Sequence, residues 1–151
     1  MLWGAIARGR SAAMCFIEGK FNADGYIDIL TRDMLPSACK IIGPHFTFLK
    51  DNDAKHGGPR GSLKVRDWIK RHKVRRIPFP ARSPDLNPIE HVWTRLKTKV
   101  NERNPRNVKE LSEYIDKTFF SFDRNFIFFL IHSISARLRA MIKTKGGYTK
   151  Y

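Results

Sequence analysis

The stretch of sequence that decides the fold is Ser83-Pro84-Asp85-Leu86-Asn87-Pro88-Ile89-Glu90, which runs directly into His91-Val92-Trp93. Its two prolines stiffen the chain, since each fixes its own backbone φ angle. Asn87 suits a helix N-cap, Pro88 suits the first helical position, and Glu90 falls at the third. The stretch therefore predicts a rigid turn that delivers the Glu90 carboxylate onto the first turn of a helix.

A second carboxylate lies upstream, at the end of a predicted strand. The segment 46–50 reads as a buried strand that ends in Asp51, and 38 residues separate Asp51 from Glu90. That interval has room for a helix over 63–72 and a strand over 74–78. Carboxylates at a strand end and at a helix start can converge on divalent metal ions, which phosphoryl transfer uses. This layout is typical of an RNase H-like nuclease or polynucleotidyl transferase.

Each carboxylate also has a purely structural explanation. Asn87 and Glu90 have the spacing of a capping box, in which each satisfies a backbone N–H of the helix start. The segment 51–53, Asp-Asn-Asp, suits an Asx turn after a strand. The structural and chemical roles can coexist, and spacing alone leaves both open. The nearby His56 and His91 are interpreted as surface or supporting side chains rather than as ligands.

Further strings accompany these two motifs. They are Met1-Leu2-Trp3-Gly4-Ala5-Ile6, Gly25-Tyr26-Ile27-Asp28-Ile29-Leu30 and the terminal Lys145-Gly146-Gly147-Tyr148-Thr149-Lys150-Tyr151. Together with the stretches 51–56 and 83–90, they resemble the DDE catalytic core of mariner-type (Tc-like) transposases. The resemblance covers essentially the whole chain, and the stretch 83–90 is its most specific part. It implies an α/β fold of the RNase H-like class, a mixed sheet with flanking helices.

The resemblance also implies roles for individual residues. The second catalytic Asp of the family falls on Asp51 and its final Glu on Glu90, so both would be catalytic and would ligate Mg²⁺ or Mn²⁺. Asp53 is not the ligand by this match. The interval between the two carboxylates is longer than the commonest version in the family, with the extra residues around 57–62. A loop insertion of this kind is tolerated at small entropic cost.

The start of the chain departs from the family pattern. The family's first catalytic Asp belongs on a strand before the one that matches Leu2–Ile6, and this chain starts at Met1. The resemblance therefore implies a single truncated catalytic domain over 1–151, with an RNase H-like core over 1–104 and C-terminal helices over 105–151. Without the central strand, we expect either direct pairing of 2–7 with 46–50 or a sheet split into two strand pairs.

Basic side chains dominate the second part of the chain. Residues 1–62 carry a net charge of +2, whereas residues 63–151 carry 21 basic and 8 acidic side chains, a net of +13. Such clusters favour phosphate backbones. No base-reading motif accompanies them, so binding should be largely independent of sequence. A solvated face or a nuclear targeting signal is the alternative. The residues predicted to contact DNA are Lys64, Lys70, Arg71, Lys73, Arg75, Arg76, Arg82 and Lys97.

The remaining elements follow from the spacing of apolar residues. Strands are expected over 2–7 and 12–17, and a helix is expected to begin at Asn22 and to stop at Pro36. The helix from Pro88 to about 102 should turn Trp93 toward the core rather than toward a stacked base. Two apolar stripes predict C-terminal helices; they are Val108, Leu111, Ile115, Phe119 and Ile131, Ile134, Leu138, Met141.

Three further features of the sequence concern a helix end, membrane spans and the redox compartment. The helix of the second stripe has four cations toward its end, which are Arg137, Arg139, Lys143 and Lys145. The helix dipole explains them, since it favours positive charge near a helix C-terminus. The longest apolar run, 126–131, is too short to span a membrane. Two cysteines without metal-ligand spacing suggest a reducing compartment.

Two hypotheses for function remain. The first is a transposase-derived core that cleaves and joins DNA with divalent metal in the nucleus, for DNA transposition and integration, with an N-terminal transposase fragment or a second copy as candidate partners. The alternative is a non-enzymatic DNA-binding or regulatory remnant of a domesticated or decayed transposon. The absent first Asp favours the alternative for residues 1–151 in isolation, which are expected to be inactive alone. An RNase H-like nuclease acting on RNA fits the fold but not the family strings.

Overall fold

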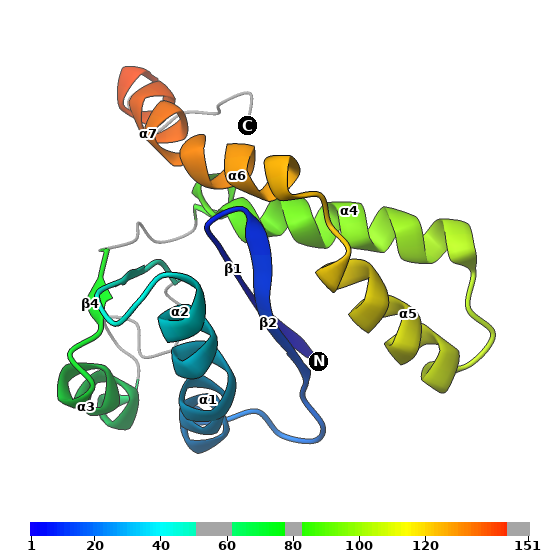
Figure 1. Cartoon of the computed structure of the whole chain (residues 1–151), viewed down its shortest axis with the longest axis horizontal. Coiled ribbons are helices and arrows are strands. Elements are labelled where there is room, and N and C mark those ends of the chain that lie inside the picture. Colours follow the sequence, from blue (N-terminus) through cyan, green and yellow to red (C-terminus); the bar gives the residue numbers. More distant parts are fainter. Residues whose placement is uncertain (51–61, 78–82, 145–151) are drawn as a thin grey trace. The chain divides into compact units, whose positions relative to one another are not determined.

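The chain divides into two compact units, and the computed structural model describes residues 1–50, 62–77 and 83–144 of them. The first unit comprises Met1–Gly4 and Cys15–Pro84, and the second comprises Ala5–Met14 and Asp85–Tyr151. Figure 1 shows the elements of both units in chain order. The sequence-based division at residues 104 and 105 stays a prediction.

A β-hairpin opens the chain and contributes to both units. Its strands, β1 (Leu2–Ala7) and β2 (Arg10–Phe16), form a two-stranded sheet. Arg8 and Gly9 both have positive φ, 44° and 76°, which is the geometry of a two-residue type I′ turn. A Cβ on Gly9 would lie 3.1 Å from the carbonyl oxygen of Arg124. Glycine therefore allows both the turn and the close approach of the hairpin tip to the backbone at Arg124.

A continuous helical stretch follows in the first unit. It consists of α1 (Ala23–Ile29), a π-helical turn (Leu30–Met34) and α2 (Leu35–Ile41). Asn22 caps it as predicted, since its side chain accepts a hydrogen bond from the backbone N–H of Gly25 at 3.0 Å. The prediction that Pro36 stops the helix is wrong. The N–H of Leu35 bonds to the carbonyl of Leu30, five residues back, and this wider turn accommodates the proline ring.

The predicted helix over 63–72 is confirmed as α3 (Leu63–Arg71), which packs against α1 in the first unit. Its Val65, Trp68 and Ile69 are buried, and the indole N–H of Trp68 donates to the Thr31 hydroxyl at 3.0 Å. These three residues form the inner face of α3.

The predicted strands on either side of α3 are shorter than expected. They are β3 (Thr47–Phe48) and β4 (Arg75–Arg76), which pair in parallel with Thr47 opposite Arg75. The described strands thus form two separate two-stranded sheets, β1 with β2 and β3 with β4. Of the two outcomes expected from the sequence, the split sheet is confirmed, and direct pairing of 2–7 with 46–50 does not occur among the described residues.

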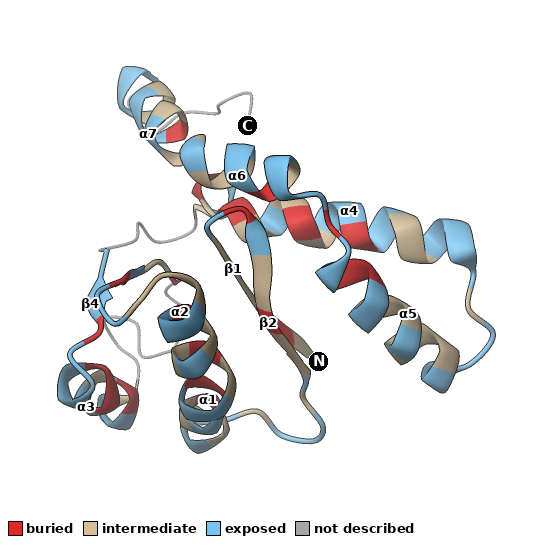
Figure 2. Cartoon of the chain, in the orientation of Figure 1, coloured by how far each residue is buried: buried red, intermediate tan, exposed pale blue. Residues whose placement is uncertain are grey.

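The second unit is helical apart from the hairpin tip. A short 3₁₀ turn (Pro84–Leu86) leads into α4 (Pro88–Arg103), followed by α5 (Val108–Phe120), α6 (Arg124–His132) and α7 (Ile134–Lys143). Helix α4 packs against α5 and α6, and α6 packs against α7. Figure 2 shows the buried positions along the facing sides of α4, α5 and α6. They include Val92, Leu96, Phe119 and Ile127, and Phe122 is buried in the connection between α5 and α6.

The aromatic contacts and the apolar stripes of the second unit test the sequence interpretation. Trp93 is half-buried and stacks on the buried Phe119 with ring centroids 5.5 Å apart, so it faces the core side of α4 as predicted. Two members of the stripes were wrongly predicted to face the core, because Val108 is 81% exposed and Leu138 is 38% exposed. The inner position of α7 is taken instead by Arg137, which is 3% exposed.

The last two helices form one long apolar stretch. Residues Arg124–Lys143 are long and apolar enough to cross a membrane by length and composition alone, and few of them are buried. The uninterrupted apolar run 126–131 is too short to show this, because polar and charged residues interrupt the longer stretch. A buried arginine within the stretch, Arg137, bonds to the start of α4. That contact is the packing of a helix against the rest of its unit.

Candidate functional site

Glu90 lies on the first turn of α4, as the sequence predicts. Its side chain is exposed. Its backbone N–H donates to the carbonyl of Asn87 at 3.2 Å, and its carbonyl accepts from the Thr94 hydroxyl at 2.9 Å. Asn87 is the N-cap but makes no side-chain capping hydrogen bond. The Asn87 half of the predicted capping box is therefore not formed, and the turn that carries Glu90 needs other restraints.

Asp51, the other predicted ligand, lies outside the described residues. Its strand is described up to Lys50, which is buried and follows β3 by two residues. Within the described ranges, no group of three or more His, Cys, Asp or Glu side chains has the geometry to hold a metal ion. The described residues therefore include one candidate ligand, Glu90, but do not form a metal site by themselves, and the Asp51–Glu90 pair stays a prediction.

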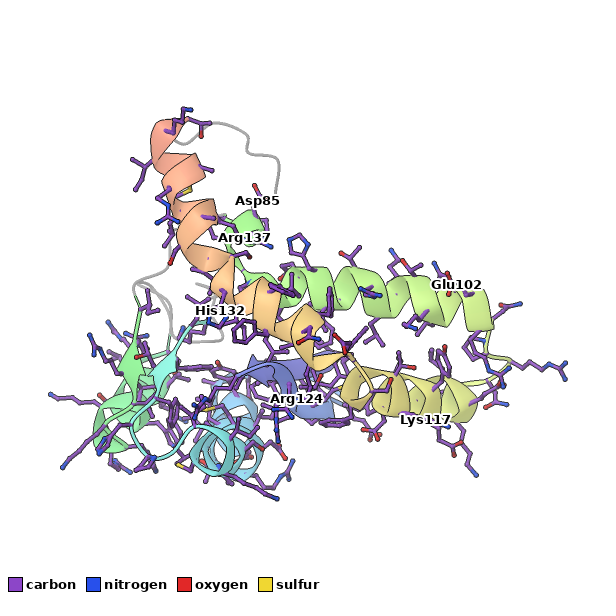
Figure 3. The ribbon with its side chains drawn as sticks, turned by 45° about the horizontal axis from the view of Figure 1, so that its top comes forward. Asp85, Glu102, Lys117, Arg124, His132 and Arg137 are labelled. Atoms are coloured by element: carbon purple, nitrogen blue, oxygen red, sulfur yellow. The ribbon has the colours of Figure 1, made fainter. Side chains whose placement is uncertain are left out.

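A buried arginine from α7 holds the two ends of the turn that carries Glu90. Nη1 of Arg137 donates to the carbonyl oxygen of Asp85 and bonds to Nε2 of His91, both at 2.7 Å. Nε of Arg137 donates to the Ser133 hydroxyl at 2.8 Å. Figure 3 shows Arg137 on α7 beside Asp85. One guanidinium group therefore connects the segment just before Glu90 with the residue just after it.

The contact with Arg137 also fixes the state of His91. A guanidinium nitrogen can only donate, so Nε2 of His91 must accept, and the ring proton of the neutral imidazole lies on Nδ1. Burial lowers the pKa of the His91 imidazole below its ordinary value. The Arg137 charge lowers the pKa further, whereas the Asp85 carboxylate raises it. His91 is thus half-buried and structural, in agreement with its interpretation as a supporting residue.

Most of the predicted DNA contacts gather on one part of the first unit. Six of them are exposed on α3, on β4 and on the connection between these elements, and we call them the basic surface. They are Lys64, Lys70, Arg71, Lys73, Arg75 and Arg76. Lys64 forms an ion pair with Asp24 at 2.8 Å. Lys97 is exposed on α4 of the second unit, and Arg82 lies outside the described residues.

Sequence reasoning missed Arg137 because it assigned the inner position of α7 to Leu138. Counting from Ile134, a core position recurs after three residues as well as after four, and Arg137 meets the first spacing. The dipole explanation of this cation is wrong, because Arg137 lies in the middle of α7 rather than in its last turn. The available signal was an arginine four residues after Ser133, a spacing that brings the two side chains onto one helix face.

The chain belongs to the DDE superfamily endonuclease family, which it matches over residues 1–112. It is 32% identical over 151 residues to the transposable element Tcb1 transposase of Caenorhabditis briggsae and 32% identical to the transposable element Tc1 transposase of Caenorhabditis elegans. Both comparisons cover 100% of this chain and 54% of the relative. The chain thus spans about half the length of these relatives. The resemblance to Tc-like DDE transposases is confirmed.

Solved structures show the same fold. The catalytic domain of the Mos1 mariner transposase matches with a TM-score of 0.87 at 20% identity, over 99% of this chain and 75% of that chain. The structure of the Mos1 catalytic domain and Raltegravir with Mg gives the same TM-score. A Mos1 transposase paired-end complex with left transposon end matches with a TM-score of 0.80 over 93% of this chain and 42% of that chain, at 20% identity. The predicted RNase H-like α/β fold is confirmed.

Proposed function

We propose that this chain is the DNA-processing part of a transposase, acting in DNA transposition and integration by metal-dependent phosphoryl transfer. The observation that carries the proposal is the placement of Glu90. It is an exposed carboxylate on the first turn of a helix, in a chain of the DDE superfamily endonuclease family. The Tc1 and Tcb1 relatives, which are transposases, support the reaction class. The nucleus, which holds most of the DNA of a eukaryotic cell, is the proposed location.

The proposed metal ligands are Asp51 and Glu90, and the proposed ion is Mg²⁺ or Mn²⁺. Carboxylate oxygens are the ligands that these ions prefer. The Mos1 catalytic domain has been solved with Mg and with Mn, which supports the choice of ion. When bound, the ion would supply charge stabilisation at the reacting phosphate. The protein's own contribution is to hold Glu90 on a rigid helix start.

The proposed DNA ligand is the phosphate backbone, bound in part by the basic surface. Its six exposed cations include two arginines on β4, whose planar guanidinium groups suit phosphate oxygens. The Mos1 complex with left transposon end supports DNA as the partner. Because phosphates are identical along the duplex, this contact positions the DNA without reading its sequence.

Calorimetric titration of Mn²⁺ into the chain tests the metal assignment. Wild type should bind Mn²⁺, and Glu90→Gln and Asp51→Asn should each weaken binding about tenfold or more, since each removes an anionic ligand. Glu102→Gln is the matched control, because Glu102 is an exposed carboxylate on the last turn of the same helix. It should bind Mn²⁺ like wild type.

The outcome separates the two hypotheses. Loss of Mn²⁺ binding in the Glu90 and Asp51 variants alone supports the enzyme core. Wild type that binds DNA but not Mn²⁺ would favour the alternative, a non-enzymatic DNA-binding or regulatory remnant of a transposon. Equal weakening by the Glu102 change would overturn the assignment of Glu90 as a ligand.

A further inference from the structure

We propose that Arg137 is a positioning residue that sets the orientation of the Glu90 turn. The proposal rests on the proposed function, in which Glu90 binds the metal ion. Arg137 itself touches neither metal nor DNA in this account. It acts through the backbone at Asp85 and the side chain of His91, which bracket Glu90.

The first argument is geometric. The two protons on Nη1 of Arg137 account for two bonds of 2.7 Å, one to the Asp85 carbonyl and one to His91 Nε2. Asp85 lies in the 3₁₀ turn before α4, and His91 lies in the first part of α4 itself. A single rigid group therefore fixes the separation between the incoming turn and the helix, and only the residues 86–90 lie between these two attachment points.

The second argument is that the ordinary restraint on this helix start is missing. At the N-caps of α1, α5 and α6 the cap side chain accepts a backbone N–H, at 2.9 to 3.0 Å. Asn87, the N-cap of α4, makes no such bond. The starts of α3 and α7 lack a side-chain cap as well, but the Arg137 contacts restrain the helix start that carries the candidate ligand.

The third argument is electrostatic. A helix N-terminus carries partial positive charge, so a cation beside it is unfavourable for helix stability. Burying an arginine side chain there adds a desolvation cost. Helix stabilisation alone would favour a neutral or acidic group at this place. The guanidinium is explained by what it can do that such groups cannot, which is to donate in one plane to Asp85, His91 and Ser133 at once.

The hydrogen bond between Arg137 and Ser133 restrains the guanidinium group itself. The Ser133 hydroxyl accepts from Nε of Arg137 at 2.8 Å and donates to the Leu130 carbonyl at 2.7 Å. This bond extends the connection from the Glu90 turn through α7 to the end of α6. The C-terminal helices, which carry no predicted ligand, thereby support the position of one.

Three variants of the chain test the proposal. Arg137→Met keeps the length of the side chain but removes every donor, and Arg137→Lys keeps the charge and one donor group. Arg139→Met is the matched control, since Arg139 is exposed on the same helix. Two readouts are used. They are the amide hydrogen exchange of residues 89–92 and the affinity for Mn²⁺, with Glu90→Gln as the reference for a lost ligand.

The expected result is faster exchange at residues 89–92 in Arg137→Met and about tenfold weaker Mn²⁺ binding, as is typical when a residue that orients a metal ligand is removed. Arg137→Lys should recover part of both, and Arg139→Met should match wild type. The ¹⁵N signal of His91 Nε2, an acceptor in wild type, should shift in Arg137→Met. If Arg137 had a purely structural role, Arg137→Met would lower the melting temperature without a selective change in the exchange, the Mn²⁺ affinity or the His91 signal around Glu90.

The outcomes separate this proposal from the metal assignment. Wild-type exchange and wild-type Mn²⁺ affinity in Arg137→Met would overturn the positioning role. Faster exchange at 89–92, in a chain whose Mn²⁺ binding does not depend on Glu90, would support the hold on the turn and overturn the metal assignment. If Arg137→Met does not fold, Arg137→Lys and Ser133→Ala decide, because each removes only part of the contact set. Unchanged exchange in both would overturn the proposal.

Discussion

DNA binding by the basic surface should depend on salt to an extent that follows from its geometry. Of its six cations, Lys64 is engaged by Asp24 at 2.8 Å. Arg75 and Arg76 are successive strand residues, so they point to opposite sides and only one can face a given duplex. About four phosphate contacts remain. Each contributes about −0.9 to the slope of log K against log salt concentration, which gives a slope of about −3.6.

This slope predicts that raising the salt concentration from about 50 to about 200 mM weakens binding about 150-fold. The double change Lys70→Gln with Lys73→Gln removes two contacts and should reduce the slope to about −1.8. Fluorescence anisotropy of a labelled duplex at several salt concentrations measures both values. Lys40→Gln is the control, because Lys40 is exposed on α2 in the same unit.

Three results would refute this reasoning. One is a slope near zero, which would mean that binding does not release counterions. Another is an equal loss of slope in the Lys40 control, which would mean that general charge rather than the basic surface attracts DNA. The third is a strong preference for one duplex sequence, since phosphate contacts cannot provide it.

Two further predictions concern the thiols and the core. Burial, with a contribution from the charge of Asp33, raises the pKa of the Cys15 thiol. Iodoacetamide should therefore label exposed Cys39 faster than Cys15 at neutral pH. The labelling rate of Cys15 should keep rising as the pH is raised past the ordinary pKa of a thiol. Equal labelling rates for the two cysteines, measured by peptide mass spectrometry, would contradict this. Phe119→Ala should lower the free energy of unfolding by about 3–5 kcal/mol, since the ring is fully buried against Trp93. Phe129→Ala, at a side chain that is 68% exposed, should cost far less in the same urea titration, and similar costs would show that the core is placed wrongly.

The sequence predicted the elements whose local signals agree with one another. The helix at 63–71 has both a clear apolar period and a place to pack, and α4 begins at the Asn-Pro signal before Glu90. The pairing of strands was predictable as well, because the hairpin around Gly9 closes locally and the described part of the chain includes no third strand that joins either pair. Elements in which local preference and packing agree can be predicted from the sequence.

The errors arise where tertiary contacts override local preference. A proline such as Pro36 normally ends a helix, but the π-helical turn before it accommodates the ring. No local sequence pattern predicts that turn. Leu138 is a natural core residue, yet Arg137 takes the inner position because the Asp85 carbonyl and His91 lie there to receive its donors. Such acceptors belong to a distant segment, so the sequence of α7 alone contains no sign of them.

The central claim is that Asp51 and Glu90 share a divalent metal site, and the most direct measurement is a crystal structure of the chain grown with Mn²⁺. An anomalous difference map locates the ion independently of the protein atoms. The account predicts one Mn²⁺ ion bound by the carboxylates of both Asp51 and Glu90, or two ions about 4 Å apart that are each bound by one of these carboxylates. Carboxylates separated by well over about 10 Å, too far to share ions at that spacing, would contradict it.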